Sequence, residues 1–380
     1  MGIKSNNPTE SYFNFFSESG SLFVVRRTGP LSASGGTKVT SPTYITHFFT
    51  SSGSFVVDGG SDNVEYLMVA GGGSGGGTPP SSAVVASGGG GGGGVISSLP
   101  EGPGGPSGPT RSASSQPMGV GSYAVTVGSG GVGGPTSPSP RAGQPGNDSV
   151  VVFSPTVTLT AKGGAEGGTH NTDNPTPQPA YGSGGGGGYD ETPDGVLPGY
   201  TGDALQGYAG GNGAMGASGG GGGADATGNS TAQYGPPANG GNGGAGKGFA
   251  NIPTDYGTSG PSPTLRYFAA GGGGGSEQTR LPSVFGVGGE GGGGNGGQRG
   301  PDPTLGTPGT ANTGGGGGGR SAPGTCASGS AGGAGGSGIV IVRGPSSITF
   351  GVSPGTNSTS THPGGDKLAT FTVSGTLTVS

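Results

Sequence analysis

The sequence predicts an all-β protein in which short strands alternate with ordered polyglycine segments, and in which no significant α-helix forms. Glycine supplies 103 of the 380 residues and is concentrated in blocks, among them residues 88–94, 271–275 and 314–319. Short β-type runs, such as residues 64–70 and 339–342, bracket these blocks. Because no window carries a helical hydrophobic period, strands and glycine segments account for the predicted order.

The strand-like runs differ in how much of each face we expect to be buried. Residues 46–58 contain two β-rich runs joined at a Ser-Gly pair, which predicts a hairpin or a tight strand break. Residues 63–70 and 338–343 are apolar on both faces, as in central strands covered on both sides. Residues 121–128 and 154–162 alternate more regularly, which predicts half-exposed strands.

The glycine blocks lie in two insertions, residues 71–121 and 163–336. In polyproline II geometry a chain rises about 3.1 Å per residue and has no internal hydrogen bonds, so six glycines span about 19 Å. Their N–H and C=O groups must then pair with neighbouring segments. The opposing cost is glycine's chain entropy, about 0.5–1 kcal/mol per residue relative to alanine. A bundle of polyglycine II helices held by strands at its ends would pair these backbone groups and offset the entropy cost. The alternative is that the glycine blocks are flexible Gly/Ser linkers.

Composition argues against several classes of function. Only 9% of residues are charged, and 14 basic against 19 acidic residues provide no cationic surface for nucleic acid. The single cysteine, Cys326, excludes an intramolecular disulfide framework and a multi-cysteine metal site. There is no signal peptide and no apolar run of membrane-spanning length, so we expect no membrane insertion.

Two glycine motifs match the spacing of nucleotide-binding loops but lack the residues that must follow such loops. Residues 128–133 match G-x-G-x-x-G, but the Pro-Thr-Ser-Pro at 135–138 stands where a crossover helix must begin. Residues 241–247 have the spacing of a phosphate loop, but Gly248 replaces the required Ser or Thr. The histidines are scattered: His47, His170 and His362. We therefore expect no catalytic site and no cofactor.

Two groups of residues are candidates for binding. Asp190, Glu191 and Asp194 form the densest acidic patch and could hold calcium, although they lack a regular calcium-loop spacing and fit a plain acidic turn better. Several tyrosines lie at loop or block edges, where they suit recognition of a sugar or protein on a receptor and equally suit capping of the glycine bundle. They are Tyr181, Tyr189, Tyr200, Tyr208, Tyr234 and Tyr256.

An internal repeat links the two ends of the chain. Residues 49–57 and 371–379 share the pattern F-T-x-S-G-(S/T)-(F/L)-x-V. The second copy resembles the opening hairpin of a second, uncompleted module, and chance similarity in a Ser/Thr/Gly-rich sequence is the alternative. As strands, residues 369–380 would complete a sheet of the same chain or add to a sheet edge in a neighbouring subunit.

The first forty residues differ from the rest of the chain. Residues 1–27 are rich in aromatic side chains, and a Gly/Pro/Ser linker follows at residues 28–38. We interpret them as an arm that attaches to a larger particle, or alternatively as a strand packed within the protein's own oligomer. The candidate attachment residues are Tyr12, Phe13, Phe15, Phe16 and Phe23. The predicted organisation is residues 1–40 (arm and linker), 41–344 (glycine-rich domain) and 345–380 (hairpin extension).

From residue 44 to residue 343, the order of five motifs carries a family resemblance. The motifs are FTSSGSFVV, VEYLMVAGGGSGGG, SYAVTVGSGGVGG, VTLTAKGG and GGAGGSGIVIVR. Together they are similar to the glycine-rich domain of virion and tail-fibre proteins of tailed bacteriophages. The resemblance implies a β-sandwich-like base that carries a packed bundle of left-handed polyglycine II helices, with the connecting loops facing the host.

The resemblance implies a structural protein on the surface of the phage particle. We expect a tail fibre or fibre-tip adhesin that binds a host-surface glycan or outer-membrane protein. We also expect contacts with other virion proteins through the N-terminal arm, and a homo-oligomer, with a trimer favoured. One alternative is an appendage or decoration protein of the head, neck or tail that binds no host. A remote alternative is an ice-binding polyglycine protein.

Overall fold

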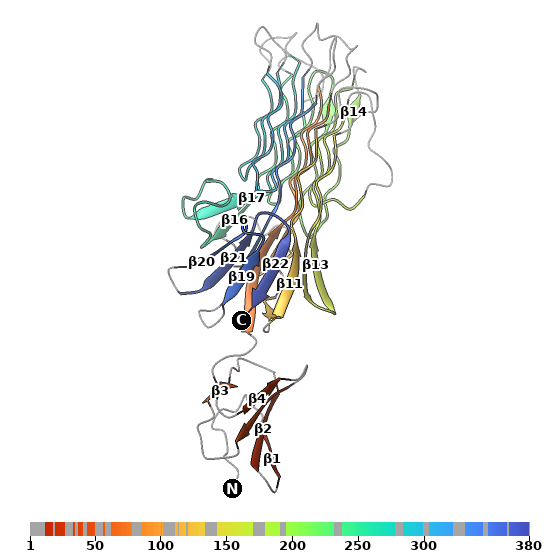
Figure 1. Ribbon diagram of the computed structural model, residues 1–380. Helices are drawn as coiled ribbons and strands as arrows, with labels where there is room; N and C mark the ends of the chain where they lie inside the picture. Colours follow the sequence, from red (N-terminus) through yellow and green to blue (C-terminus); the bar gives the residue numbers. More distant parts are fainter. Residues whose placement is uncertain are drawn as a thin grey trace.

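In the computed structural model the chain is mostly β, with no helix among the described residues and with several antiparallel sheets (Figure 1). Side chains are described for residues 63–77, 86–99, 101, 114–118, 122–133, 143–169, 179–190, 195–231, 238–277, 284–298, 304–321, 331–344, 349–362 and 365–379. The backbone alone is described for residues 12–17, 20–26, 33–34, 37–40, 44–49, 56–57, 62, 111–112 and 121. In this part of the chain no helix has the length and hydropathy needed to cross a membrane.

The N-terminal strands form a four-stranded sheet in the order β1-β2-β5-β4 and a separate pair, β3 with β6. Their bounds are β1 (Tyr12–Ser17), β2 (Gly20–Arg26), β3 (Ala33–Ser34), β4 (Thr37–Thr40), β5 (Tyr44–Phe49) and β6 (Val56–Val57). The predicted arm therefore contains paired strands, and the predicted boundary at residue 40 falls inside the four-stranded sheet, because β5 pairs with β2 and β4. The side chains of the predicted attachment residues lie outside the described part.

A seven-stranded sheet has the order β20-β21-β18-β7-β8-β9, with β10 paired to β7. Its strands are β7 (Asp62–Val69), β8 (Val95–Ser97), β9 (Arg111–Ser112), β10 (Gln116–Met118), β18 (Ile339–Gly344), β20 (Ser358–Thr361) and β21 (Lys367–Phe371). Side chains of β7 alternate between two apolar clusters, with Tyr66 and Met68 in one and Leu67 and Val69 in the other. The prediction of a central strand covered on both faces is confirmed for β7, and β18 alternates in the same way.

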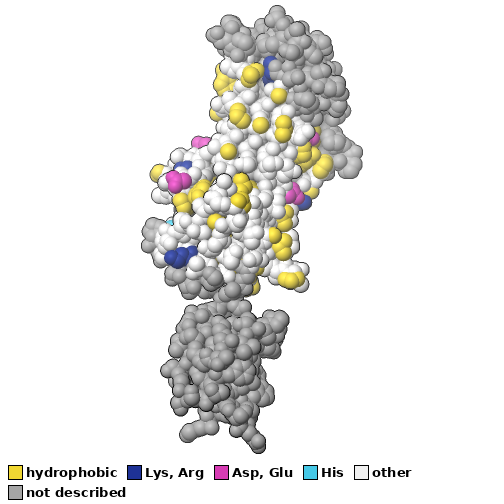
Figure 2. Space-filling view, in the orientation of Figure 1, with side chains coloured by type: hydrophobic (Ala, Val, Ile, Leu, Met, Phe, Trp, Pro, Cys, Tyr) yellow, Lys and Arg dark blue, Asp and Glu magenta, His cyan; other side chains and the backbone are white. Residues whose placement is uncertain are grey.

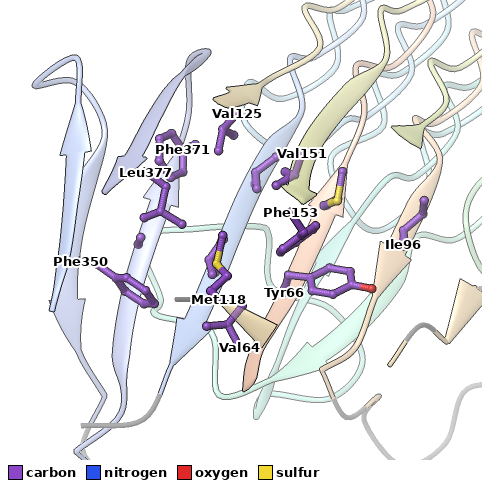
Figure 3. Close-up of a cluster of buried hydrophobic side chains, with 14 of the residues drawn as sticks. Val64, Tyr66, Ile96, Met118, Val125, Val151, Phe153, Phe350, Phe371 and Leu377 are labelled. Atoms are coloured by element: carbon purple, nitrogen blue, oxygen red, sulfur yellow. The ribbon is translucent and has the colours of Figure 1, made fainter. Parts of the chain in front are cut away.

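A five-stranded sheet, in the order β13-β12-β11-β22-β19, faces the first of these clusters. Its strands are β11 (Gly121–Thr126), β12 (Ser149–Ser154), β13 (Val157–Ala161), β19 (Phe350–Ser353) and β22 (Gly375–Val379). Figure 3 shows side chains of both sheets meeting there, such as Tyr66 and Phe153, whose ring centroids are 5.1 Å apart. On β11, Val125 is buried while the flanking Ala124 and Thr126 are exposed, as the alternating pattern predicts.

The second copy of the repeat crosses from one sheet to the other. β21 pairs with β18 and β20, whereas β22 pairs with β11 and β19. The predicted hairpin between them is therefore wrong, because Phe371 and Leu377 fill one core from two different sheets. The first copy also separates its strands, since β5 and β6 belong to different sheets. Both C-terminal strands complete sheets of the same chain.

Between the strands, the glycine segments run side by side away from the two large sheets (Figure 1). Segment 88–94 shows how they are joined. Its first and fourth N–H groups donate to segment 163–168, its second and fifth to segment 218–223, and its third and sixth to segment 314–319, over 2.8–3.1 Å. Segment 88–94 is therefore held by hydrogen bonds to three neighbouring segments, and the partner segment repeats with a period of three residues.

At the edge of this array, side chains replace missing backbone partners. The N–H of Val284 donates to the Oδ1 of Asn239 at 3.1 Å, and the N–H of Val287 to the Oδ1 of Asn242 at 2.9 Å. Asn295 accepts from the N–H of Gly288 in the same manner, at 2.9 Å. Asparagine at outward positions three residues apart therefore closes the hydrogen-bond network where no further segment follows.

Replacing Asn242 with alanine is expected to lower the free energy of unfolding by about 1 kcal/mol, because the N–H of Val287 loses its acceptor. Urea unfolding followed by circular dichroism measures the change. Asn229→Ala is the matched control, since Asn229 is equally exposed and no side-chain hydrogen bond is described for it. Equal losses in the two variants would contradict the assigned role.

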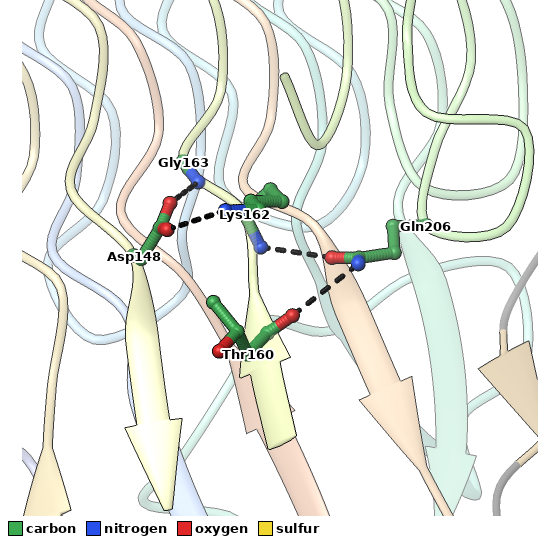
Figure 4. Close-up of polar contacts among 5 residues, drawn as sticks. All are labelled: Asp148, Thr160, Lys162, Gly163 and Gln206. Atoms are coloured by element: carbon green, nitrogen blue, oxygen red, sulfur yellow. Dashed lines mark hydrogen bonds and ion pairs between the residues drawn. The ribbon is translucent and has the colours of Figure 1, made fainter. Parts of the chain in front are cut away.

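The transition from strand to glycine segment is fixed by polar side chains (Figure 4). Asp148 accepts from the N–H of Gly163 at 2.9 Å and pairs with the Nζ of Lys162 at 3.0 Å. Gln206 accepts from the N–H of Lys162 at 2.8 Å and donates to the carbonyl of Thr160 at 3.3 Å. These contacts hold the end of β13 at the point where the backbone leaves the sheet and enters the glycine array.

Two two-stranded sheets extend from the glycine array. They pair β14 (Val196–Leu197) with β15 (Gly213–Ala214), and β16 (Lys247–Ala250) with β17 (Leu265–Phe268). Figure 1 places β16 and β17 beside the junction of sheets and glycine segments, and β14 farther along the bundle. The second hairpin packs Phe249 and Phe268 into the cluster that also holds Leu67 and Val69.

Candidate functional site

Three adjacent glycine-rich segments bring Glu166, Tyr181 and Tyr200 together. The N–H of Gly182 donates to the carbonyl of Gly163 at 2.8 Å, which aligns the second segment with the first. The N–H of Tyr200 donates to the carbonyl of Gly185 at 2.8 Å, which adds the third segment. We refer to Glu166, Tyr181 and Tyr200 as the Glu–Tyr cluster.

The Glu–Tyr cluster contains a buried carboxylate. Glu166 is 8% exposed, and the hydroxyl of Tyr200 donates to its Oε1 at 3.3 Å. The rings of Tyr181 and Tyr200 meet edge to face, with centroids 5.9 Å apart and planes at 81°. The other carboxylate oxygen, Oε2, has no hydrogen-bond partner among the described residues. Tyr181 is half-buried and therefore forms the outer wall of the cluster.

Burial and charge keep both tyrosines protonated. Burial, followed by the charge of Glu166, raises the pKa of Tyr181 from 10.0 to about 12. The same causes, again with burial the largest, raise the pKa of Tyr200 still further above its usual range. Both hydroxyls are therefore hydrogen-bond donors at neutral pH. The two hydroxyls suit holding a carboxylate or binding a polar group, and the raised pKa values make them poor proton acceptors.

The raised pKa of Tyr181 predicts a loss of stability in alkali. Between pH 10.0 and about 12 the folded protein retains a proton that the unfolded chain releases, so the free energy of unfolding falls as pH rises through this window. In Tyr181→Phe the fall is expected to be shallower. Urea unfolding below and within the window measures the slope. Tyr208→Phe, outside the cluster, serves as the control, and an equal change of slope in both variants would contradict the assignment.

The other predicted tyrosines do not join this cluster. Tyr189 is 3% exposed, and Tyr200 of the cluster is 4% exposed, so both side chains pack within the bundle. Receptor contact by these tyrosines stays a prediction. Tyr208 is half-buried, and the hydroxyl of half-buried Tyr256 shares a hydrogen bond with Ser358 Oγ at 2.8 Å. Tyr234 lies outside the described residues.

The weak calcium site is only partly described. Asp190 is half-buried, whereas Glu191 and Asp194 lie outside the described residues. Within the described part, no three His, Cys, Asp or Glu side chains gather in a way that could hold a metal ion. Calcium binding by this patch therefore stays a prediction.

Both nucleotide-loop matches lie in the glycine array. The N–H of Gly131 donates to the carbonyl of Gly72 at 2.9 Å, so a backbone donor of the first match is already used. In the second match, the N–H groups of Gly241 and Gly244 donate to Ser218 and Gly221. A phosphate-binding loop needs such donors free and a helix after them, and no helix occurs in the described residues.

Glu166 was not singled out from the sequence. Its only sequence signal is its position as an acidic residue within a glycine block, GGAEGG at residues 163–168, a position that it shares in kind with Glu290. Neighbouring segments enclose a residue in a glycine block, so a carboxylate there is buried. A buried carboxylate needs hydrogen-bond or charged partners. Tyr181 and Tyr200, which contact Glu166, follow it in the chain by 15 and 34 residues, so no local motif joins the three.

A family model described as a glycine-rich domain matches residues 50–345. No curated protein matches the chain. The matched range begins just after β5 and ends just after β18, so it contains the glycine array and much of both large sheets.

Proposed function

We infer, because this chain belongs to the glycine-rich domain family over residues 50–345, that it is a non-enzymatic display scaffold. The observation that carries this inference is the glycine array, in which each segment is hydrogen-bonded to several neighbours and anchored in sheets. In the proposed biological setting the scaffold is a structural virion protein of a tailed phage, namely a tail fibre or fibre-tip adhesin.

We assign the glycine segments to left-handed polyglycine II helices on a β-sandwich-like base. The three-residue period of hydrogen-bond partners supports this assignment, because polyproline II geometry has three residues per turn. Two sheets that share one apolar cluster support the base. A bundle of such helices is stiff, since every segment is restrained from several sides.

A stiff bundle suits the presentation of the sequences that join its segments. Residues 170–178 and 78–85, which are outside the described part, are rich in Pro, Thr, Ser and Asn. The visible face of the described bundle carries few charged side chains (Figure 2). We propose that these connecting sequences bind a neutral host-surface glycan or an outer-membrane protein. The N-terminal strands would attach the protein, as a homo-oligomer, to the particle.

Binding to host cells tests this function. The full chain, labelled with a fluorophore, is expected to bind saturably to the host bacterium and to compete with phage adsorption. Replacing residues 170–178 with a Gly/Ser sequence of equal length is expected to weaken binding with little change in the unfolding midpoint. The matched control replaces residues 345–348, which join two base strands, with Gly/Ser. Folded protein that neither binds cells nor competes would instead support the decoration role.

A further inference from the structure

A buried lysine lies between two carboxylates at the start of β16. The Nζ of Lys247 is 2.8 Å from Glu101 Oε2 and 3.0 Å from Asp225 Oδ1. The side chain of Lys247 is 3% exposed, that of Asp225 15% and that of Glu101 34%. An amine, a carboxyl carbon and a second carboxylate are therefore held together at a largely dry position.

Apolar side chains surround this group. Leu99, Ala224 and Phe249 are buried in the same cluster, and they lie within two residues of Glu101, Asp225 and Lys247 respectively. An isolated backbone bridge pairs Glu101 with Phe249, which places the second carboxylate beside β16. By contrast, the Lys162–Asp148 pair has the same 3.0 Å contact with both side chains 39% exposed. Of these two lysines, Lys247 is sheltered from water and Lys162 is not.

We propose that Lys247 and Asp225 condense into an intramolecular isopeptide bond, with Glu101 as the catalytic base. The bond joins the Nζ of Lys247 to the Cγ of Asp225. Proximity favours this reaction, because a donor and an acceptor held at hydrogen-bond distance are already close to the geometry of attack. Exclusion of water opposes the reverse hydrolysis.

The reaction needs no oxidant and no co-reactant. The ammonium group of Lys247 transfers one proton to the carboxylate of Asp225, which leaves an amine and a carboxylic acid. The amine nitrogen attacks Cγ and forms the N–C bond. Glu101 accepts a second proton from this nitrogen and returns it to the departing hydroxyl as the C–O bond breaks. The products are one amide and one water, and Glu101 ends as a carboxylate.

The electrostatics of Asp225 fit this sequence. Burial raises the pKa of Asp225, and the charge of Glu101 adds to it, in excess of the lowering caused by Lys247. The carboxylic acid form needed for attack therefore costs Asp225 less than it costs an exposed aspartate. For Lys247, burial lowers the pKa, but hydrogen bonds to Glu101 and Asp225 raise it by more. Before the reaction, the side chain of Lys247 is therefore an ammonium ion. The carboxylates of Glu101 and Asp225, which contact it, can accept its protons.

The bond would tie the β16–β17 hairpin to the glycine array. Asp225 lies two residues after the array segment 218–223, and Lys247 opens β16. A covalent link between them closes a chain loop that contains array residues 238–246 and so restricts the unfolded chain. In a protein exposed to mechanical load, such a link would prevent the hairpin from peeling away.

Mass spectrometry of the denatured full chain tests the proposal. The intact mass is expected to be lower than the sequence mass by one water, and trypsin is expected not to cleave after Lys247. Peptide mapping is expected to find one branched peptide that contains Lys247 and Asp225. An intact mass equal to the sequence mass, or a missing water that maps elsewhere, would overturn the proposal.

Glu101→Gln tests the catalytic role separately. This variant keeps the side-chain shape and is expected to retain free Lys247 and Asp225 peptides, with the full sequence mass. Asp148→Asn alters the exposed ion pair and is expected to leave the branched peptide in place. If Glu101→Gln fails to fold, the wild-type peptide map still decides whether the bond exists. An undiminished branched peptide in folded Glu101→Gln would overturn the role of Glu101.

Discussion

Replacing Gly90 with alanine is expected to destroy the cooperative folding of the glycine array. The N–H of Gly90 donates to Gly317 at 2.8 Å, and its carbonyl accepts from Gly272 at 2.9 Å. A Cβ at this position would lie 2.2 Å from the carbonyl oxygen of Gly73. The obstacle is backbone that is itself hydrogen-bonded, so no rotamer change can relieve it. We expect a loss of about 3 kcal/mol or more in the free energy of unfolding.

Urea unfolding followed by circular dichroism and tyrosine fluorescence measures this effect. Gly355→Ala is the matched control, because a Cβ on Gly355 would meet nothing within 4 Å. The control is expected to keep the wild-type midpoint, within the range of about 0.5 kcal/mol usual for surface changes. A Gly90→Ala protein with the same midpoint as the control would show that the segments are not closely packed.

Removing residues 374–380 is expected to give a chain that is insoluble or unfolds without cooperativity. These residues include β22, which lies between β11 and β19 in the five-stranded sheet. Leu377 is fully buried and Val379 is 2% exposed, so the shared core would lose two apolar side chains. β11 and β19 would also lose a common partner, which leaves unpaired edges prone to aggregation.

Size-exclusion chromatography and thermal unfolding measure the result of this truncation. The matched control replaces Thr376 and Thr378 with serine in the intact chain, since both side chains are exposed on the same strand. The control is expected to elute and unfold like the wild type. A truncated protein that stays soluble and unfolds cooperatively would contradict the assigned role of β22 in the core.

The strands that can be predicted from sequence are those in which the order of apolar and polar residues indicates which faces are buried. Residues 66–69 of β7 and 339–342 of β18 are apolar at successive positions, and both strands lie at the centre of the seven-stranded sheet. On β11, which the sequence predicts to alternate, Val125 is buried while Ala124 and Thr126 are exposed. Local pattern is sufficient here because a residue's polarity reflects which face of the strand it occupies.

The sequence pattern misled where two segments meet only through the fold. The F-T-x-S-G repeat has the local character of a hairpin, yet its C-terminal copy places β21 and β22 in different sheets. The Glu–Tyr cluster was likewise only half predicted, because the tyrosines stood out at block edges and Glu166 did not. Lys247 and its two carboxylates carry no local signal, since Glu101, Asp225 and Lys247 are far apart in the chain.

The sequence by itself determines that the glycine blocks can approach one another through their backbones, because glycine has no Cβ to separate them. It also determines which strands are covered on both faces. Only the tertiary structure decides which segments become neighbours. Segment 88–94, for example, bonds to segments 163–168, 218–223 and 314–319. Glycine has no side chain, so the glycine residues themselves cannot select one neighbouring segment over another. The choice of partner therefore comes from the strands and polar clamps at the ends of the segments, which place each one in the array.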